Sequence, residues 1–207
     1  MKLRGLYVIT DEKLTPYDRM LDMVEKALKG GASIVQLRDK NNSDEFLIPY
    51  CHELKNLCHR YDAIFIVNDR VDLALKVDAD GVHVGEEDPD VVEVRQKTKG
   101  KIMGVSCYGS VERALQMQEL GADYVAFGSF YPSPTKPKSR IVPKSVVSEA
   151  KKVLKIPVCV IGGLTVENSK ELVDMGADMV AVISDVWTAP DIELRCREYL
   201  KLFKKEI

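Results

Sequence analysis

The stretch Gly121-Ala-Asp-Tyr-Val-Ala-Phe-Gly128 contains a helix-to-strand turn followed by a short apolar run. A glycine followed by a small residue is typical of a helix that ends in the left-handed conformation, with the next strand starting close by. The pattern returns as Gly176-Ala-Asp and, in weaker form, as Gly31-Ala-Ser and Asp78-Ala-Asp-Gly81. Because a strand-like run follows each copy, this weak internal repeat predicts a chain built from helix-then-strand units.

Apolar runs alternate with segments of helical period eight times along the chain. The predicted strands are residues 6–10, 34–38, 64–68, 81–84, 102–106, 124–128, 158–162 and 179–184. Strands buried on both faces and joined by helices imply parallel pairing with right-handed crossovers. Eight units in 207 residues predict an α/β protein, a single-domain (βα)8 TIM barrel spanning residues 1–207. A doubly wound open sheet is the alternative.

The composition narrows the range of partners. No apolar run approaches the roughly 20 residues that span a bilayer. The formal net charge of −2 gives no bulk attraction to nucleic acid or to an anionic membrane, so an anion site must come from a local cluster. Five scattered cysteines indicate free thiols in a reducing compartment and predict a cytoplasmic location.

A long loop, residues 128–143, follows one of the apolar runs and has the composition of an anion site. Its four prolines exclude a continuous helix or strand. No Asp or Glu lies between Gly128 and Ser148, and the segment carries four cations: Lys136, Lys138, Arg140 and Lys144. Its hydroxyl groups come from Ser129, Ser133, Thr135 and Ser139. This composition predicts a site for a phosphorylated ligand, with a solvated connector as the plainer alternative.

The predicted second strand and its end read Ile34-Val-Gln36-Leu-Arg38-Asp-Lys40. Side chains alternate along a strand, so Gln36 and Arg38 share a face with Ile34. Polar groups on a buried strand need partners. One interpretation is that Arg38 pairs with an internal carboxylate and stabilises the barrel. Lys40 adds a second cation just beyond the strand and favours an anion site.

Acidic residues follow the next two predicted strands. Asp69 lies in Asn68-Asp69-Arg70, and Asp88 precedes Pro89. Helix capping explains either aspartate alone. Mg²⁺, however, typically takes one or two carboxylates together with phosphate oxygens. Asp69 and Asp88, at adjacent strand ends near cations, are therefore candidate Mg²⁺ ligands.

Three further strand ends carry candidate residues. Ser106 places a hydroxyl at the end of the fifth strand, Gly163 follows the seventh, and Ser184 ends the eighth. Phosphate sites in such barrels often use the loops after these last two strands. His83 lies between valines in the middle of a strand, where a hydrogen-bonded interior histidine is favoured over a general base.

Taken together, these motifs resemble the thiamine phosphate synthase family, and the resemblance covers essentially the whole chain in order. The motifs are Gln36-Leu-Arg-Asp-Lys40, Asn68-Asp69, Gly81-Val-His-Val-Gly85 with Asp88, Gly104-Val-Ser-Cys107, Pro132-Ser-Pro-Thr-Lys136, Ile161-Gly-Gly163 and Val182-Ile-Ser184. Two positions depart from the family pattern. Ser133-Pro134 stands where some members have Thr-Glu, and Glu86 stands where many have glutamine.

The resemblance implies a (βα)8-barrel transferase of thiamine biosynthesis. Such enzymes join the pyrophosphate ester of 4-amino-5-hydroxymethyl-2-methylpyrimidine to 4-methyl-5-(2-phosphoethyl)thiazole. The products are thiamine phosphate and pyrophosphate, formed by dissociative substitution with Mg²⁺ as cofactor. The implied partners are these two small phosphorylated substrates, with no nucleic acid and no membrane. Association into a homo-oligomer is left open.

The resemblance also implies roles for residues at matching positions. The pyrimidine pyrophosphate would contact Gln36, Leu37, Arg38, Asp39, Lys40, Asn68, Ser106 and Lys136. Among these, the implied catalytic residues are Arg38, Lys40, Ser106 and Lys136. The thiazole phosphate would contact Ser133, Pro134, Thr135, Gly163, Ile183 and Ser184. Asp69 and Asp88 would bind Mg²⁺.

Three alternatives remain at this stage. A thiazole tautomerase of the same superfamily would not need the complete set of pyrophosphate and Mg²⁺ residues. A non-catalytic sensor of a phosphorylated ligand would leave Asp69 and Asp88 unused. A sugar-phosphate isomerase or epimerase would need a dedicated acid/base pair, which we do not find in the sequence.

Overall fold

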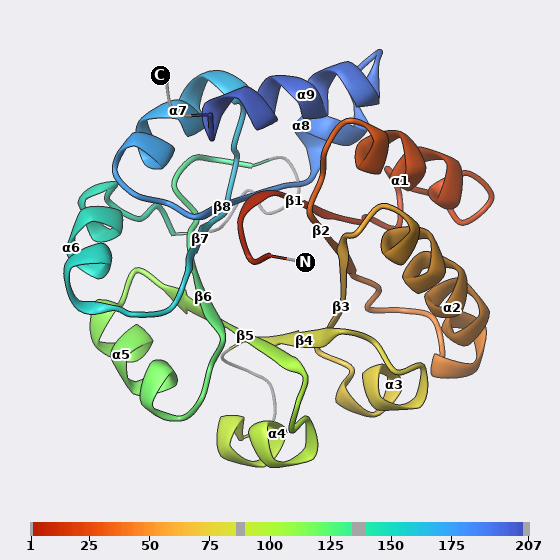
Figure 1. Cartoon of the computed structure of the whole chain (residues 1–207), viewed down its shortest axis with the longest axis horizontal. Helices are drawn as coiled ribbons and strands as arrows, with labels where there is room; N and C mark the ends of the chain where they lie inside the picture. The colour runs from red at the N-terminus through yellow and green to blue at the C-terminus, as the bar shows by residue number, and fades with distance from the viewer. Residues whose placement is uncertain (1, 86–89, 134–139, 205–207) are drawn as a thin grey trace.

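In the computed structural model, which describes residues 2–85, 90–133 and 140–204, eight parallel strands close into a barrel (Figure 1). The strands are β1 Gly5–Ile9, β2 Ile34–Leu37, β3 Ile64–Asn68, β4 Gly81–Val84, β5 Ile102–Tyr108, β6 Tyr124–Phe127, β7 Val158–Val160 and β8 Met179–Val182. Each strand pairs with its neighbours in sequence, and β1 closes the ring on β8 with Val8 opposite Val182. The predicted barrel is confirmed, and the open sheet is excluded.

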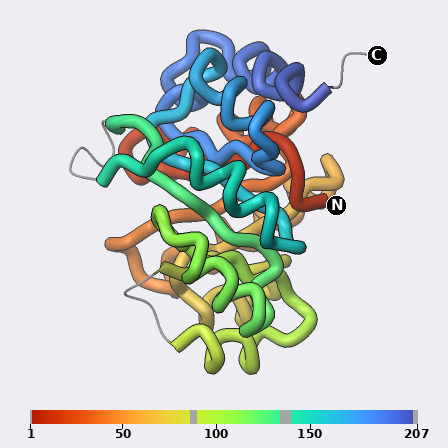
Figure 2. The backbone as a smooth tube through the Cα atoms, turned by 90° about the vertical axis from the view of Figure 1, so that its left-hand side faces the viewer, coloured from red at the N-terminus to blue at the C-terminus, as the bar shows by residue number. Residues whose placement is uncertain are grey.

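Helices form a layer around the barrel in the described part of the chain. They are α1 Met20–Lys29, α2 Asp44–Arg60, α3 Val71–Lys76, α4 Val91–Lys97, α5 Val111–Glu119, α6 Ser145–Val153, α7 Val166–Asp174, α8 Ser184–Trp187 and α9 Ile192–Leu202. Figure 2 shows α5 and α6 side by side over the strands. Local sequence explains the helix starts. The Ser43 hydroxyl caps α2, and Thr165 and Asn168 form a capping box at α7. None of the described helices is long and apolar enough to cross a bilayer.

The last predicted strand was too long. Residues 179–184 were expected to be extended, but β8 ends at Val182 and Ser184 begins the short helix α8. Trp187, the last residue of α8, is buried, and its indole N–H donates to the carbonyl of Ile9 at 2.7 Å. A contact between the two ends of the chain therefore decides this boundary.

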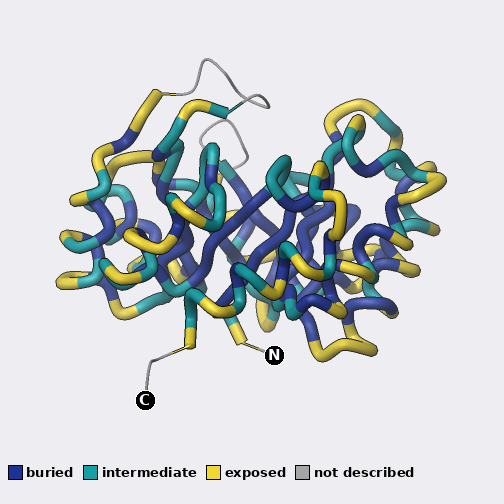
Figure 3. Tube along the Cα trace, turned by 90° about the horizontal axis from the view of Figure 1, so that it is seen from above, coloured by how far each residue is buried: buried dark blue, intermediate teal, exposed yellow. Residues whose placement is uncertain are grey.

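Alternation along the strands divides the core into two parts. Inward side chains of several strands form one cluster inside the barrel, for example Tyr7, Ile34, Ile66, Tyr124 and Met179. The alternate side chains pack between the strands and the helices. Figure 3 shows the buried residues at the centre and the exposed ones on the periphery. All five cysteines are buried and free, as expected for unpaired thiols.

One glycine makes room for a large side chain inside the barrel, that of Tyr124. A Cβ added at Gly104 would lie 2.0 Å from the ring of Tyr124. Tyr124 can therefore cross the barrel interior only because position 104 has no side chain. The described ends of the chain lie close together, since the guanidinium of Arg4 donates to the carbonyl of Phe203 at 3.4 Å. That the barrel domain spans the full range 1–207 stays a prediction.

Candidate functional site

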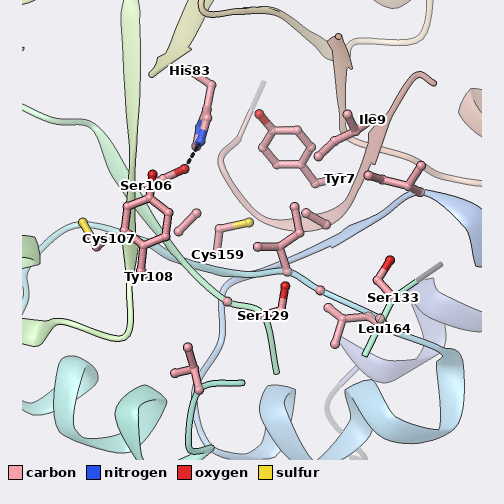
Figure 4. Close-up of a pocket in the computed structure, with 18 of the residues that line it drawn as sticks. Tyr7, Ile9, His83, Ser106, Cys107, Tyr108, Ser129, Ser133, Cys159 and Leu164 are labelled. Atoms are coloured by element: carbon pink, nitrogen blue, oxygen red, sulfur yellow. Dashed lines mark hydrogen bonds between the residues drawn. The ribbon is translucent and has the colours of Figure 1, made fainter. Parts of the chain in front are cut away.

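A pocket of about 970 Å³ opens where the strands end at their carboxyl side, as expected for this fold (Figure 4). Every strand contributes to its lining, through Tyr7, Gln36, Asn68, His83, Ser106, Ala126, Cys159 and Ala181 among others. The volume is within the range typical of small-molecule sites. The inner faces of the strands thus continue directly from the packed core into the pocket.

A chain of hydrogen bonds crosses the bottom of the pocket from β3 to β5. Its links are Asn68 to Gln36 at 2.9 Å, Gln36 to Tyr7 at 2.8 Å, Tyr7 to Tyr124 at 2.7 Å, Tyr124 to His83 at 2.8 Å and His83 to Ser106 at 2.7 Å. Burial raises the pKa of both tyrosines far above the ordinary value, so their hydroxyls stay protonated. The network fixes the orientation of the polar groups that face the pocket.

The Gln36 amide donates to the Tyr7 hydroxyl, and the hydroxyls of Tyr7 and Tyr124 share a hydrogen bond. His83 joins the Tyr124 hydroxyl through Nδ1 and the Ser106 hydroxyl through Nε2, the latter contact drawn as a dashed line in Figure 4. His83 is a hydrogen-bonded interior residue, as expected.

Two polar groups in the pocket wall have no partner within the described residues. The buried Oδ1 of Asn68 accepts no hydrogen bond in the described chain. Leaving a buried acceptor unpaired costs roughly 1–3 kcal/mol, so such an atom indicates a donor supplied by a ligand. The guanidinium of Arg38 is half-buried, lines the pocket and pairs with no carboxylate of residues 2–85, 90–133 or 140–204. An internal brace for Arg38 is thus absent from the described structure.

Lys40 and Asp69 meet at the ends of β2 and β3. The ammonium group of Lys40 contacts the carboxylate of Asp69, whose backbone has φ of 61°. The described residues contain no group of three or more His, Cys, Asp or Glu that could hold a metal ion. The second predicted ligand, Asp88, lies outside the described residues, so the two-carboxylate site stays a prediction.

The side chains of Leu37 and Asp39 do not line the pocket. Leu37 packs in the cluster between strands and helices. The Asp39 carboxylate accepts hydrogen bonds from the backbone of Asn41 and Asn42, from the Asn42 amide and from the Tyr17 hydroxyl. Burial alone would raise the pKa of Asp39, but these bonds outweigh it and lower the pKa to about 2. The side-chain geometry therefore gives no support to substrate contacts from these two residues.

The loops after β6, β7 and β8 form one side of the pocket. Ser133, Gly163, Ile183 and Ser184 all line it, whereas Pro134, Thr135 and Lys136 lie outside the described residues. Gly163 has φ of 62°, and a Cβ there would lie 2.4 Å from the carbonyl oxygen of Pro132. Glycine is thus required because the β6 and β7 loops touch, and a larger residue would displace backbone.

Among the pocket residues that sequence reasoning missed are Tyr7, Tyr124 and Arg113. The tyrosines lie in predicted strands, but their position relative to one another depends on closure of the barrel. A phenol in a strand that is buried on both faces was an available signal, since a buried hydroxyl needs a partner. Arg113 lies on α5, outside any strand end, and no motif drew attention to it.

The closed parallel barrel with a polar, cation-bearing pocket at the carboxyl ends of its strands defines a (βα)8-barrel enzyme. Within that class, residues 6–186 match the family model described as thiamine monophosphate synthase. The chain belongs to this family.

Individual relatives agree over the full length. The chain is 42% identical over 204 residues to a thiamine-phosphate synthase of Thioalkalivibrio sulfidiphilus, covering 98% of this chain and 97% of the relative. It is 43% identical to that of a Janthinobacterium species, covering 98% of both. The solved structure of thiamine phosphate pyrophosphorylase from Pyrococcus furiosus has a TM-score of 0.88 and 38% identity, over 96% of this chain and 95% of that one. The predicted synthase activity and transferase class are confirmed, and the tautomerase and sensor alternatives are not supported.

Proposed function

We propose that this pocket joins the pyrimidine pyrophosphate to the thiazole phosphate and releases thiamine phosphate and pyrophosphate. One observation carries the proposal. Gln36, Asn68 and Ser106, predicted from three separate strand ends, line a single pocket and belong to one hydrogen-bond chain. An orphaned acceptor at Asn68 and an unpaired guanidinium at Arg38 suit an anionic heterocyclic ligand.

The pyrimidine pyrophosphate occupies the side of the pocket formed by β2 to β5. Gln36, Asn68 and Ser106 hold the pyrimidine half, while Arg38 and Lys40 lie toward the pyrophosphate. Arg38 is suited to this role because a planar guanidinium binds two phosphate oxygens at once. Lys136, outside the described residues, belongs to the same group by family resemblance.

The thiazole phosphate occupies the side formed by the loops after β6, β7 and β8. Ser133 and Ser184 supply hydroxyl groups, and Gly163 and Ile183 supply backbone at the same wall. Pro134 and Thr135 complete this group in the proposal. The two phosphorylated substrates then approach one another across the hydrogen-bond chain at the bottom of the pocket.

Mg²⁺ fits this arrangement as a cofactor. Mg²⁺ usually binds proteins through one or two carboxylates and completes its shell with phosphate oxygens and water, so a larger acidic cluster is not required. Asp69 and Asp88 would hold the ion, with Lys40 as the partner of Asp69 when the ion is absent. When bound, Mg²⁺ would neutralise charge on the pyrophosphate.

The reaction needs positioning and charge stabilisation rather than a nucleophilic side chain. The bond from the pyrimidinylmethyl carbon to the pyrophosphate oxygen breaks, and its electron pair leaves with the pyrophosphate. The lone pair of the thiazole nitrogen then forms the new carbon–nitrogen bond, and no proton is transferred. Arg38, Lys40 and Lys136 stabilise the departing charge, and the Tyr7 and Tyr124 layer closes the bottom of the pocket against water.

Location and assembly are part of the proposal. Burial raises the pKa of four thiols, Cys51, Cys58, Cys107 and Cys196, to about 12. Such unreactive, unpaired cysteines suit a reducing cytoplasm. A homo-oligomer is compatible with the pocket, which one chain forms by itself.

Incubation of the purified protein with both substrates and Mg²⁺ tests the proposal. Thiamine phosphate and pyrophosphate should appear in equal amounts, and a chelator should stop the reaction. A chain that isomerises a thiazole carboxylate phosphate but forms no thiamine phosphate would contradict it. Arg60→Gln, which removes one exposed positive charge at the last residue of α2, is the matched control and should retain full activity.

A further inference from the structure

Arg113 is a pocket residue for which neither the motifs nor the resemblance supplies a role. It lies in the first turn of α5 and its Nε donates to the backbone carbonyl of Ser106 at 3.0 Å. The side chain is half-buried and lines the same pocket as Arg38. No Asp or Glu of the described residues forms an ion pair with it. The Nε edge of the guanidinium is therefore anchored on the Ser106 carbonyl, and the group also hydrogen-bonds with the Cys107 thiol. Because a thiol is a weak acceptor, donor capacity remains at the terminal nitrogens for a ligand.

Three partly buried arginines of the described chain differ from Arg113. Arg70 pairs with Asp44, Arg95 with Asp123 and Arg195 with Asp185. A half-buried cation without a carboxylate is costly unless an anion compensates it. In the pocket wall, Arg38, which directly follows β2, and Arg113, on the helix after β5, both lack a carboxylate partner among the described residues.

The described cations that face the pyrophosphate do not balance its charge. Pyrophosphate carries several negative charges, whereas Lys40 and Asp69 compensate one another. Within the described residues this leaves Arg38 as the proposed pyrophosphate contact with an uncompensated charge. A second arginine would bring the positive charge closer to that of the leaving group.

We propose that Arg113 is a second arginine of the pyrophosphate site and binds the leaving group from the wall formed by β5 and α5. The inference rests on the proposed function and deepens it. The Nε bond to the Ser106 carbonyl holds the guanidinium next to a residue already assigned to the pyrimidine pyrophosphate. The terminal N–H groups can then donate two parallel hydrogen bonds to phosphate oxygens, a geometry that the ammonium group of lysine does not reproduce.

Arg113→Gln is the sharpest test. The glutamine amide nitrogen stands where Nε of arginine stands, so the bond to the Ser106 carbonyl can persist while the charged end is lost. Binding of inorganic pyrophosphate with Mg²⁺, measured by titration calorimetry, should weaken by roughly tenfold or more. Arg113→Lys should fall between this variant and the wild type. Affinity for the thiazole phosphate should change by less than twofold.

The controls separate this inference from the rest. Arg60→Gln removes the same charge outside the pocket and should leave pyrophosphate binding unchanged. A wild-type protein that does not bind pyrophosphate would contradict the proposed function itself. Wild-type binding with an equal affinity in Arg113→Gln would overturn this inference alone, as would weakening of the thiazole phosphate instead. Loss of cooperative unfolding in both Arg113 variants would assign Arg113 to the fold and also overturn it.

Discussion

The ammonium group of Lys40 contacts the carboxylate of Asp69 across the ends of β2 and β3. The two groups come from neighbouring strand ends, which the parallel register of β2 and β3 brings together. Each was assigned to the charge of the pyrophosphate, one directly and the other through Mg²⁺. In the proposed function, this contact would couple the Mg²⁺ ligand Asp69 to the pyrophosphate contact Lys40.

Asp69→Asn should disable the Mg²⁺ site while the barrel stays folded. The amide keeps the size of the side chain but loses the charge that holds the ion and Lys40. We expect kcat to fall by roughly 100-fold and the Mg²⁺ concentration for half-maximal activity to rise. Steady-state rates over a Mg²⁺ titration measure both. Asp72→Asn, at an exposed position of α3 nearby, should behave as wild type. Unchanged Mg²⁺ activation in Asp69→Asn would remove Asp69 from the metal site.

Arg38→Lys should lower the catalytic rate without lowering the stability of the fold, because no carboxylate of the described residues pairs with Arg38. A charged hydrogen bond lost at the transition state costs about 1.5–3 kcal/mol, which is roughly a 10- to 150-fold drop in single-turnover rate. Arg70→Lys is the contrasting variant. Arg70 donates to the carbonyls of Asp39 and Asn42 and to the carboxylate of Asp44, so its replacement should lower the melting temperature by several degrees. A large drop in melting temperature with an intact rate in Arg38→Lys would reverse the assignment.

Local sequence was sufficient for most of the barrel. The Gly-Ala-Asp turns and the apolar runs predicted each strand to within a few residues, because parallel strands buried on both faces leave a continuous apolar signal. The boundary of β8 was wrong because Trp187 finds its partner, the Ile9 carbonyl, almost the whole chain away. Long-range contacts of this kind have no local signature.

The candidate site was predictable where side chains follow the strand alternation. Gln36 and Arg38 were expected on one face, and both line the pocket. The same alternation places Leu37 and Asp39 on the other face. These two residues were assigned to the site only because of the family resemblance. Tyr7 and Tyr124 are 117 positions apart, and only closure of the barrel brings their hydroxyls to 2.7 Å. Pairings at that separation could not be read from spacing.

Gly104→Ala should destabilise the barrel. The added methyl group would lie 2.0 Å from the Tyr124 ring, which is fully buried and cannot move away without breaking its bonds to Tyr7 and His83. Overpacking of this kind costs about 1–3 kcal/mol or more, measurable by urea unfolding. Gly109→Ala, where the nearest atom is 3.4 Å away, is the matched control and should cost less. In a Tyr124→Leu background the penalty at position 104 should shrink. An equal penalty in both backgrounds would mean that the ring is not the obstacle.

Asp39 organises the loop that carries Lys40. Its carboxylate is the common acceptor for Tyr17, Asn41 and Asn42, and its backbone carbonyl accepts from Arg70. These bonds favour the charged form, and they lower the pKa of Asp39 from 3.8 to about 2. A carboxylate with a lower pKa in the folded state stabilises that state above its unfolded pKa, and the contribution disappears as the pH falls toward the folded value.

Asp39→Asn should therefore lower the free energy of unfolding at pH 7 by roughly 2 kcal/mol, and the gap to wild type should close between pH 4 and pH 2. Urea unfolding at a series of pH values, followed by circular dichroism, measures it. Asp22→Asn removes an exposed carboxylate on α1 whose side chain is 72% accessible, and should cost less than about 0.5 kcal/mol at every pH. A gap for Asp39→Asn that stays constant with pH would show that the loop depends on the shape of the side chain and not on its charge. If the loop also positions Lys40, the catalytic rate of Asp39→Asn should fall together with its stability. Activity measured on the folded fraction at pH 7 tests this.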